Sequence, residues 1–273
     1  MTTIDTAWPG RQLPVSDADL FVRDSDGTGS AIVFLHGLGG YSGEWSPVAS
    51  QLRDDFRVVA FDQRGQGRST TEPDDLTRDA FVNDTIAVIE HADAGPVVLV
   101  GQSMGAHTAM LTAARRPDLV SQLILIEGGL GGEGPDASHE VINWFRSWPA
   151  PFAYLPDAVS WFEGQGYRPD AARAWAAGLR ETPGGLVPRF VPEVLLQQML
   201  AVHLEKRLQE WTTVSCPTLL IKGGHGFIPA AEFDQMLSTN PRASMVEVAD
   251  AGHDVHLDAP TNIVDFIRTH LNA

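Results

Sequence analysis

The sequence predicts an α/β protein with a mostly parallel central sheet, helices on both faces of that sheet, and a helical insertion. Short apolar runs rich in β-branched residues alternate with segments of helical spacing, as in chains that build a parallel sheet. One long stretch lacks such runs, which indicates the insertion. The chain has 273 residues, 43% of them hydrophobic, so it can bury a substantial core.

Five apolar runs are the predicted buried strands. They are residues 31–35 (AIVFL), 57–61 (RVVAF), 96–100 (PVVLV), 123–126 (LILI) and 217–221 (PTLLI). A last strand is expected at 244–248, and the stretch to about Asp24 is expected to add one or two antiparallel edge strands at the start of the sheet. Helical spacing lies between the runs, at 44–52, 77–91, 103–115, 230–237 and 259–271.

The alternation stops between about residues 130 and 211, where Gly, Pro and aromatic residues gather. We therefore expect a core domain of residues 1–129 and 212–273 and a helical cap, or lid, of residues 130–211. Most of its aromatic side chains should attach the cap to the core. Those expected to line a substrate pocket are Trp144, Trp148 and Trp161.

The charge balance limits the partners. With 19 basic and 35 acidic residues the net charge is −16, which disfavours binding to nucleic acid or to an anionic membrane surface. No apolar run approaches the roughly 20 residues of a membrane span, and the first ten residues resemble no signal peptide, so we expect a cytoplasmic protein. Cys216 is the only cysteine, which excludes an intrachain disulfide. The expected partner is a small-molecule substrate.

The sequence GQSMG at 101–105 carries the strongest chemical signal. It follows the predicted strand ending at Val100 and opens the helical segment that runs to Arg115, the strand–turn–helix context of a G-x-S-x-G elbow. This context predicts an exposed, nucleophilic Ser103 at a helix N-terminus. The alternative is an ordinary serine N-cap.

A second glycine-rich turn, HGLGG at 36–40, follows the strand 31–35. Such a turn can direct a backbone N–H toward the nucleophile, so Leu38 and Met104 are the predicted oxyanion-hole donors. We expect His36 to brace its loop by hydrogen bonds rather than to act in catalysis.

A third turn, DQRGQGRS at 62–69, is expected to be scaffold whose charges satisfy backbone groups. A nicotinamide-binding domain is an alternative, because Gly37–Gly39 follows a strand and Asp62 ends the next one. Ser42 stands where the third glycine of that motif belongs.

The base is expected near the C-terminus. His253 closes the sequence ADAGH at 249–253, after the predicted last strand, and it follows Ser103 in the chain as in the order Ser, acid, His. His256 could suggest a metal site, but no third ligand or H-E-x-x-H pattern accompanies it. We expect His256 to pack at the start of the final helix.

These motifs together resemble the α/β-hydrolase family over nearly the whole chain outside the insertion. The motifs are HGLGG, DQRGQGRS, GQSMG and GHDVHLDAP, in this order. The resemblance implies a mostly parallel sheet, a cap between the sixth and seventh strands, and a Ser-His-acid triad without a cofactor. It leaves the substrate open, because esterases, lactonases, thioesterases, C–C hydrolases, lyases and cofactor-free oxygenases share these motifs.

The position of the acid departs from the commonest pattern of that family, in which an Asp follows the seventh strand. Here PTLLIKGGHGFIP places His225 at that point. A minority of the family uses a carboxylate after the sixth strand, and Glu127 stands there, so Glu127 is the predicted acid. Alternatively, Glu127 caps the turn 128–129 and Asp250 or a water completes the site.

The expected activity is that of a serine hydrolase acting on an ester or lactone bond of a small, largely apolar substrate, like a carboxylesterase or lactonase. The predicted triad is Ser103, His253 and Glu127, and no metal or cofactor is expected. Two alternatives on the same fold stay open: a lyase or cofactor-free oxygenase, and a ligand-binding protein with a slow or vestigial triad.

Overall fold

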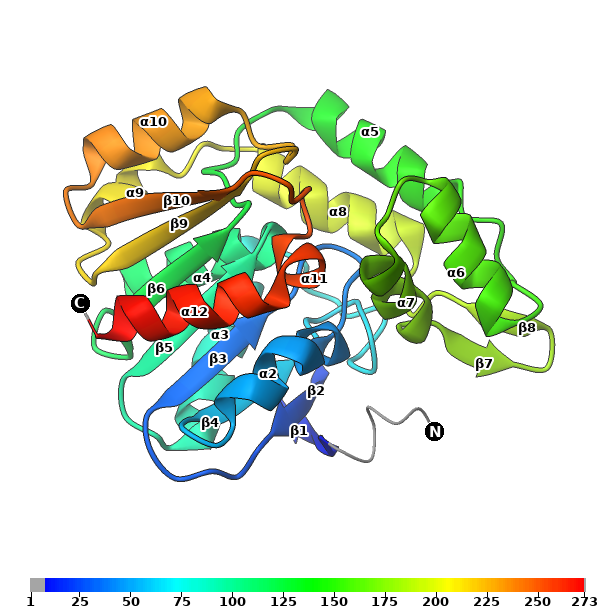
Figure 1. Cartoon of the computed structure of the whole chain (residues 1–273), viewed down its shortest axis with the longest axis horizontal. Coiled ribbons are helices and arrows are strands. Elements are labelled where there is room, and N and C mark those ends of the chain that lie inside the picture. The colour runs from blue at the N-terminus through cyan, green and yellow to red at the C-terminus, as the bar shows by residue number, and fades with distance from the viewer. Residues whose placement is uncertain (1–7, 273) are drawn as a thin grey trace.

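The computed structural model describes residues 8–272, and the N-terminal residues before Trp8 lie outside the described part. Eight strands form one sheet in the order β1-β2-β4-β3-β5-β6-β9-β10 (Figure 1). Six of them are parallel, while β1 pairs with β2 and β2 with β4 in antiparallel fashion. Their bounds are β1 Gly10–Pro14, β2 Asp19–Asp24, β3 Ala31–Leu35, β4 Arg57–Phe61, β5 Val97–Gln102, β6 Val120–Ile126, β9 Thr218–Gly223 and β10 Ala243–Val248.

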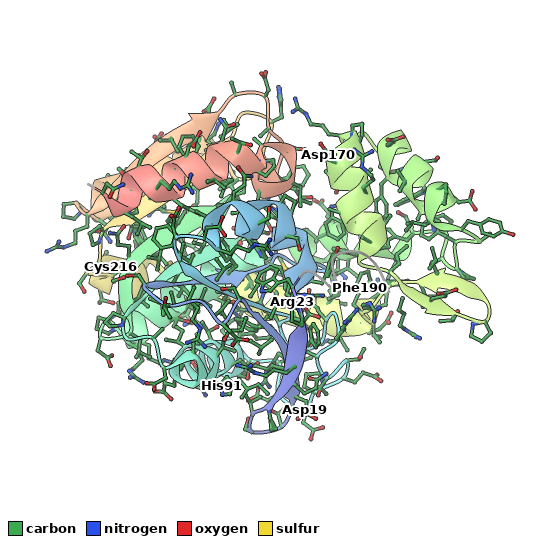
Figure 2. All side chains as sticks on the ribbon, turned by 60° about the horizontal axis from the view of Figure 1, so that its bottom comes forward. Asp19, Arg23, His91, Asp170, Phe190 and Cys216 are labelled. Carbon is green, nitrogen blue, oxygen red and sulfur yellow. The ribbon has the colours of Figure 1, made fainter. Side chains whose placement is uncertain are left out.

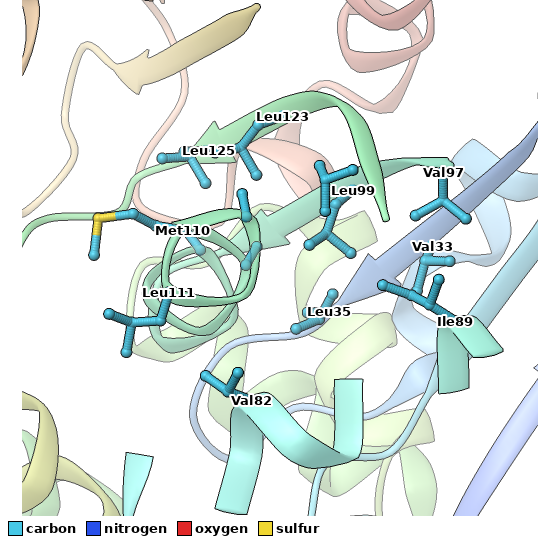
Figure 3. Packing of buried hydrophobic residues seen from close by; sticks show 14 of the residues in the cluster. Val33, Leu35, Val82, Ile89, Val97, Leu99, Met110, Leu111, Leu123 and Leu125 are labelled. Carbon is cyan, nitrogen blue, oxygen red and sulfur yellow. The ribbon is translucent and has the colours of Figure 1, made fainter. Parts of the chain in front are cut away.

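Helices cover both faces of the sheet. Because successive side chains of a strand point to opposite faces, Val33 and Leu35 of β3 enter one core cluster, and Ile32 and Phe34 enter the other. The first cluster lies under α3 (Arg78–Ala92), α4 (Met104–Arg115), α9 (Leu208–Thr213) and α10 (Ala230–Thr239), and Figure 3 shows part of this packing around α4. The second lies under α2 (Ser46–Leu52), α11 (Val255–Asp258) and α12 (Pro260–Leu271), with the short helix η1 (Ser42–Trp45).

The segment between β6 and α9 forms most of what we call the insertion, residues 130–211 (Figure 1). Besides four helices it contains a short antiparallel hairpin, which a purely helical prediction did not include. Three-residue strands are too short to produce a recognisable alternation in the sequence. The elements are α5 Pro135–Arg146, α6 Leu155–Gly164, α7 Pro169–Ala177, β7 Arg180–Thr182, β8 Gly185–Val187 and α8 Pro192–His203.

The insertion packs over the carboxyl ends of the strands. Its aromatic side chains share one buried cluster with Leu38, in the turn after β3, and with Met104, the first residue of α4. Helix α9, at the end of the insertion, instead packs against α4, and its Trp211 belongs to the core beneath the sheet. The ends of β3 and β5 therefore lie beneath the insertion.

The predicted fold class is confirmed, with a mainly parallel sheet between two helical layers. Strands β3 and β4 have the predicted bounds, whereas β6 begins at Val120, three residues before the predicted run. The extra residues, Val120, Ser121 and Gln122, include two polar side chains, so they did not extend the apolar run. Ser121 is exposed and Gln122 is only half-buried. No helix within residues 8–272 is long and apolar enough to span a membrane.

Candidate active site

The ends of β5, β6 and β9 lie side by side. Gln102 is in register with Ile126, which is in register with Ile221. Beyond the strands, the Ser103 N–H donates to the Ile126 carbonyl at 2.9 Å and the Glu127 N–H donates to the Ile221 carbonyl at 2.9 Å. The turns after these three strands therefore start at one edge of the sheet, where ligands bind in open α/β sheets.

Ser103 occupies a strained turn between β5 and α4. Its backbone has φ 51° and ψ −119°, a conformation that L-residues rarely adopt. The turn needs small neighbours, because a Cβ on Gly101 would lie 2.3 Å from the Gly105 carbonyl oxygen and a Cβ on Gly105 would lie 2.5 Å from the Leu35 oxygen. Ser103 is half-buried, at the N-terminus of α4, whose partial positive charge favours an anion there.

The backbone N–H groups of Leu38, in the turn after β3, and of Met104, the first residue of α4, have no intramolecular acceptor within residues 8–272. Both residues are buried. The loop that carries Leu38 is fixed by His36, which is fully buried: its Nε2 accepts the Gln63 N–H at 2.9 Å, and its Nδ1 lies 2.7 Å from the Gly37 carbonyl oxygen. His36 thus braces the loop.

Glu127 follows β6 in the left-handed region, with φ 47°, and its side chain is completely buried. Its carboxylate is satisfied by backbone donors from the last residue of β9 and from the loop that follows. Oε1 accepts the Gly223 N–H at 2.8 Å, while Oε2 accepts those of Phe227 at 3.1 Å and Ile228 at 3.4 Å. Backbone donors of this kind stabilise a buried carboxylate.

The remaining partner of Glu127 is His253. The His253 Nδ1 lies 3.2 Å from the Glu127 Oε2, although the two residues are 126 positions apart in the chain. About 20% of the His253 side chain is exposed. The Phe227 ring stacks on the imidazole at a centroid distance of 4.9 Å. With Nδ1 facing the carboxylate, Nε2 is the ring nitrogen left for another partner.

The loop after β9 contributes donors instead of a carboxylate. His225, at the position where the resemblance places an Asp, is exposed, and Asp250 is exposed as well. Gly226 makes room for the acid, because a Cβ there would lie 2.2 Å from the carboxylate oxygens of Glu127. Neither His225 nor Asp250 has a side-chain hydrogen bond to His253 in the described part of the chain.

A second buried acid–histidine pair lies behind the loop 36–40. The His256 Nε2 is 3.1 Å from the Glu44 Oε1, and the His256 ring packs on Trp45 at a centroid distance of 4.4 Å. Burial raises the pKa of Glu44 to about 8 and lowers the pKa of His256 to about 4, so Glu44 holds a proton near neutral pH. Residues 8–272 contain no cluster of three or more His, Cys, Asp or Glu side chains that could hold a metal ion.

The turn after β4 acts as scaffold. The Asp62 carboxylate accepts the Ser42 N–H at 2.6 Å and the Arg68 N–H at 2.7 Å. Arg64 is buried and forms a bidentate contact with Asp84 at 2.7 Å for each bond. Both carboxylate oxygens of Asp62 are therefore engaged by backbone groups of the surrounding turns.

The aromatic side chains of the insertion form a wall over the site. Trp148 is buried, and Trp144 and Trp161 are half-buried. Figure 2 shows Phe190 where the insertion meets the core, and Phe190 packs on Trp148 at a centroid distance of 5.3 Å. The cavity between this wall and the loop 36–40 is only about 10 Å³.

A much larger cavity, about 670 Å³, lies on the other side of Tyr41, between Arg68 and the β7–β8 hairpin. Neither Ser103 nor His253 lines it. Convergent polar groups and backbone strain therefore identify the candidate active site better than cavity size does.

Three residues beside the site were given no individual role from the sequence: Gln102 of the elbow motif, Trp175 of the insertion and Asp254. The Gln102 Nε2 donates to the His253 carbonyl oxygen at 3.1 Å and to the Asp254 Oδ1 at 3.3 Å, and the Trp175 Nε1 donates to the Asp254 Oδ2 at 2.9 Å. The only local signal was position, since Gln102 precedes Ser103 and Asp254 follows His253. The contact with Trp175 spans 79 positions and has no local signal.

Known proteins resemble this chain over nearly its full length. A family model described as "Alpha/beta hydrolase family" matches residues 32–266. A Mus musculus protein named sn-1-specific diacylglycerol lipase ABHD11 is 31% identical over 276 residues, covering 96% of this chain and 86% of that protein. A 2-(acetamidomethylene)succinate hydrolase from Mesorhizobium japonicum is 27% identical over 270 residues, covering 93% of this chain and 95% of that protein.

Solved structures agree with the fold. The crystal structure of E-2-(acetamidomethylene)succinate hydrolase has a TM-score of 0.88 at 24% identity and covers 97% of this chain and 100% of that chain. An enol-lactonase from Burkholderia xenovorans has a TM-score of 0.79 at 19% identity, covering 96% and 100%. Because the family model matches residues 32–266 and the Mus musculus protein is 31% identical over 96% of this chain, this chain belongs to the alpha/beta hydrolase family.

Proposed function

We propose that this chain is a serine hydrolase that cleaves an ester or lactone bond in a small, largely apolar substrate, with Ser103 as nucleophile, His253 as base and Glu127 as acid. The observation that carries the proposal is the contact of 3.2 Å between the His253 Nδ1 and the Glu127 Oε2. A buried carboxylate on Nδ1 fixes the imidazole tautomer and stabilises the imidazolium. The names of the relatives, a diacylglycerol lipase and a hydrolase among them, support hydrolysis.

The proposed reaction begins with attack of the Ser103 Oγ on the substrate carbonyl carbon, while the His253 Nε2 takes the hydroxyl proton. The Leu38 and Met104 N–H groups hold the tetrahedral oxyanion. When the intermediate collapses, the bond to the leaving oxygen breaks and the imidazolium protonates that oxygen. Water then attacks the acyl-enzyme, His253 accepts its proton, and Ser103 leaves as the alcohol.

The aromatic wall supports a largely apolar acyl group. The pocket is proposed to include Trp144, Trp148 and Trp161, which share one buried cluster with Leu38 of the loop 36–40. Aromatic side chains bind apolar groups and leave orientation to a few polar contacts. The net charge of −16 disfavours the approach of highly anionic substrates.

Labelling with a fluorophosphonate, followed by a panel of aryl esters, lactones and thioesters, tests this function. We expect covalent labelling and turnover of at least one ester or lactone, both lost in Ser103→Ala with the fold intact. Labelling of Ser103→Ala at another residue, or hydrolysis at the wild-type rate by that variant, would refute the proposal. Stoichiometric binding of the whole panel without turnover would favour a ligand-binding protein instead.

A further inference from the structure

Besides the contact with Glu127, side-chain hydrogen bonds tie the loop that carries His253 to the elbow and to the insertion. The first contact comes from Gln102, whose side-chain amide donates both to the His253 carbonyl oxygen at 3.1 Å and to the Asp254 Oδ1 at 3.3 Å. The Gln102 side chain has little freedom to move. A Cβ on Gly37 would lie 2.1 Å from its Oε1, so the loop 36–40 packs directly on the amide. The amide thus connects the elbow to the backbone of the base.

The second contact comes from the insertion. The Trp175 Nε1 of α7 donates to the Asp254 Oδ2 at 2.9 Å. Asp254 is only 9% exposed and has no salt bridge to a basic side chain within residues 8–272. Hydrogen bonds must therefore satisfy its carboxylate. Each oxygen of Asp254 has one such donor, one from the elbow and one from the insertion.

The position of Trp175 depends on how the insertion packs. Its indole contacts Trp144 and Trp148, each at a centroid distance of 5.8 Å, and stacks on Phe162 at 6.1 Å. A displacement of this aromatic cluster would carry the Trp175 Nε1 away from Asp254. The packing over the active site is therefore linked through one hydrogen bond to the loop of the base.

We propose that Asp254 and Trp175 are positioning residues. They hold the loop that carries His253 where the imidazole can accept the proton of Ser103, and they do so only while the insertion is docked on the core. The inference rests on the proposed function, because it assigns a role relative to the base. A misplacement of about 1 Å can cost on the order of 100-fold in rate. Loss of the Trp175–Asp254 bond is expected to act on kcat, with a smaller effect on KM.

A double-mutant cycle tests the link. Trp175→Phe keeps an aromatic ring but removes the donor, and Asp254→Asn removes the charge and one acceptor. We expect each to lower kcat about tenfold, and the double variant to be no slower than Asp254→Asn. The control cycle pairs Asp254→Asn with Trp211→Phe, which also removes one buried indole donor, to the Met236 carbonyl, but in the core cluster away from Asp254 and Trp175. In that cycle the two effects on kcat should multiply.

A spectroscopic readout separates positioning from general destabilisation. The low-field proton resonance of the His253 Nδ1–H, hydrogen-bonded to Glu127, should shift or broaden in Trp175→Phe and keep its position in Trp211→Phe. This comparison uses folded single variants, so it holds even if Asp254→Asn does not fold.

Multiplying effects of Trp175→Phe and Asp254→Asn, or an unchanged resonance in Trp175→Phe, would overturn the link. Such a result leaves the proposed function intact as long as Ser103→Ala abolishes labelling and turnover. If Ser103→Ala keeps turnover, the proposed function fails, whatever the cycle shows.

Discussion

Glu127 is the proposed acid, and it stands at a different position from the Asp of the commonest family pattern. Its carboxylate meets three backbone N–H groups, one at the end of β9 and two in the loop that follows, and the Nδ1 of His253. The resemblance and the strand order together predicted this residue, because β6 is the neighbour of β5 in the sheet. The donors from the loop after β9 could not be predicted, since they depend on the backbone path of that loop.

Glu127→Gln is predicted to lower kcat by up to about 10⁴-fold, because it keeps the shape of the side chain and removes the charge that stabilises the imidazolium. Steady-state kinetics on the best aryl ester of the panel measures the loss. Asp250→Asn and His225→Ala are the matched controls and should stay near the wild-type kcat, since both side chains are exposed. An equal or larger loss in Asp250→Asn would reassign the acid.

Glu44 leads to a prediction on pH and stability. Its folded pKa of about 8 lies above the ordinary 4.5, so the unfolded state binds fewer protons between these values and the free energy of unfolding falls as pH rises. His256 has the opposite sign, since its folded pKa of about 4 lies below 6.5 and stability rises with pH between those values. The two slopes offset each other up to about pH 6.5, and the net fall appears between about pH 6.5 and 8.

Urea unfolding of the wild type and of Glu44→Gln, across pH 6 to 9, measures this effect. The variant has no proton to lose at this position, so its free energy of unfolding should be flatter between about pH 6.5 and 8. The same decline in both proteins would show that Glu44 is already ionised in the folded state.

At the scale of elements, the apolar runs predicted β3 and β4 with their bounds, because a strand buried on both faces leaves an unbroken hydrophobic signal. The hairpin β7–β8 left no such signal, since its residues are exposed or half-buried. The pairing of Glu44 with His256 joins residues 212 positions apart. Contacts of this kind arise from the tertiary fold and have no local pattern.

The loop after β9 gives a prediction at this scale. Gly226→Ala should lower kcat at least about tenfold, because the added Cβ would displace the Glu127 carboxylate or the loop that binds it. Gly184→Ala, at an exposed turn where a Cβ meets nothing closer than 3.8 Å, is the matched control. Activity and melting temperature of both variants are compared, and near-normal kcat in Gly226→Ala would show that the site tolerates the displacement.

On the scale of the whole molecule, the sheet places the turns after β5, β6 and β9 at one edge, and the insertion covers that edge with aromatic side chains. The core carries Ser103, Glu127 and His253, whereas the proposed substrate pocket lies on the insertion. The boundary predicted between core and insertion, and the pocket assigned to Trp144, Trp148 and Trp161, remain predictions.

The most direct test of the proposed triad is to trap its covalent intermediate. Enzyme quenched with acid during turnover of an aryl ester is digested, and the peptides are analysed by mass spectrometry. We predict one acyl group on the peptide containing Ser103, and none in Ser103→Ala, which should also lose turnover. Continued hydrolysis by Ser103→Ala, or an acyl group on any other residue, would contradict the assignment of Ser103 as the nucleophile served by His253 and Glu127.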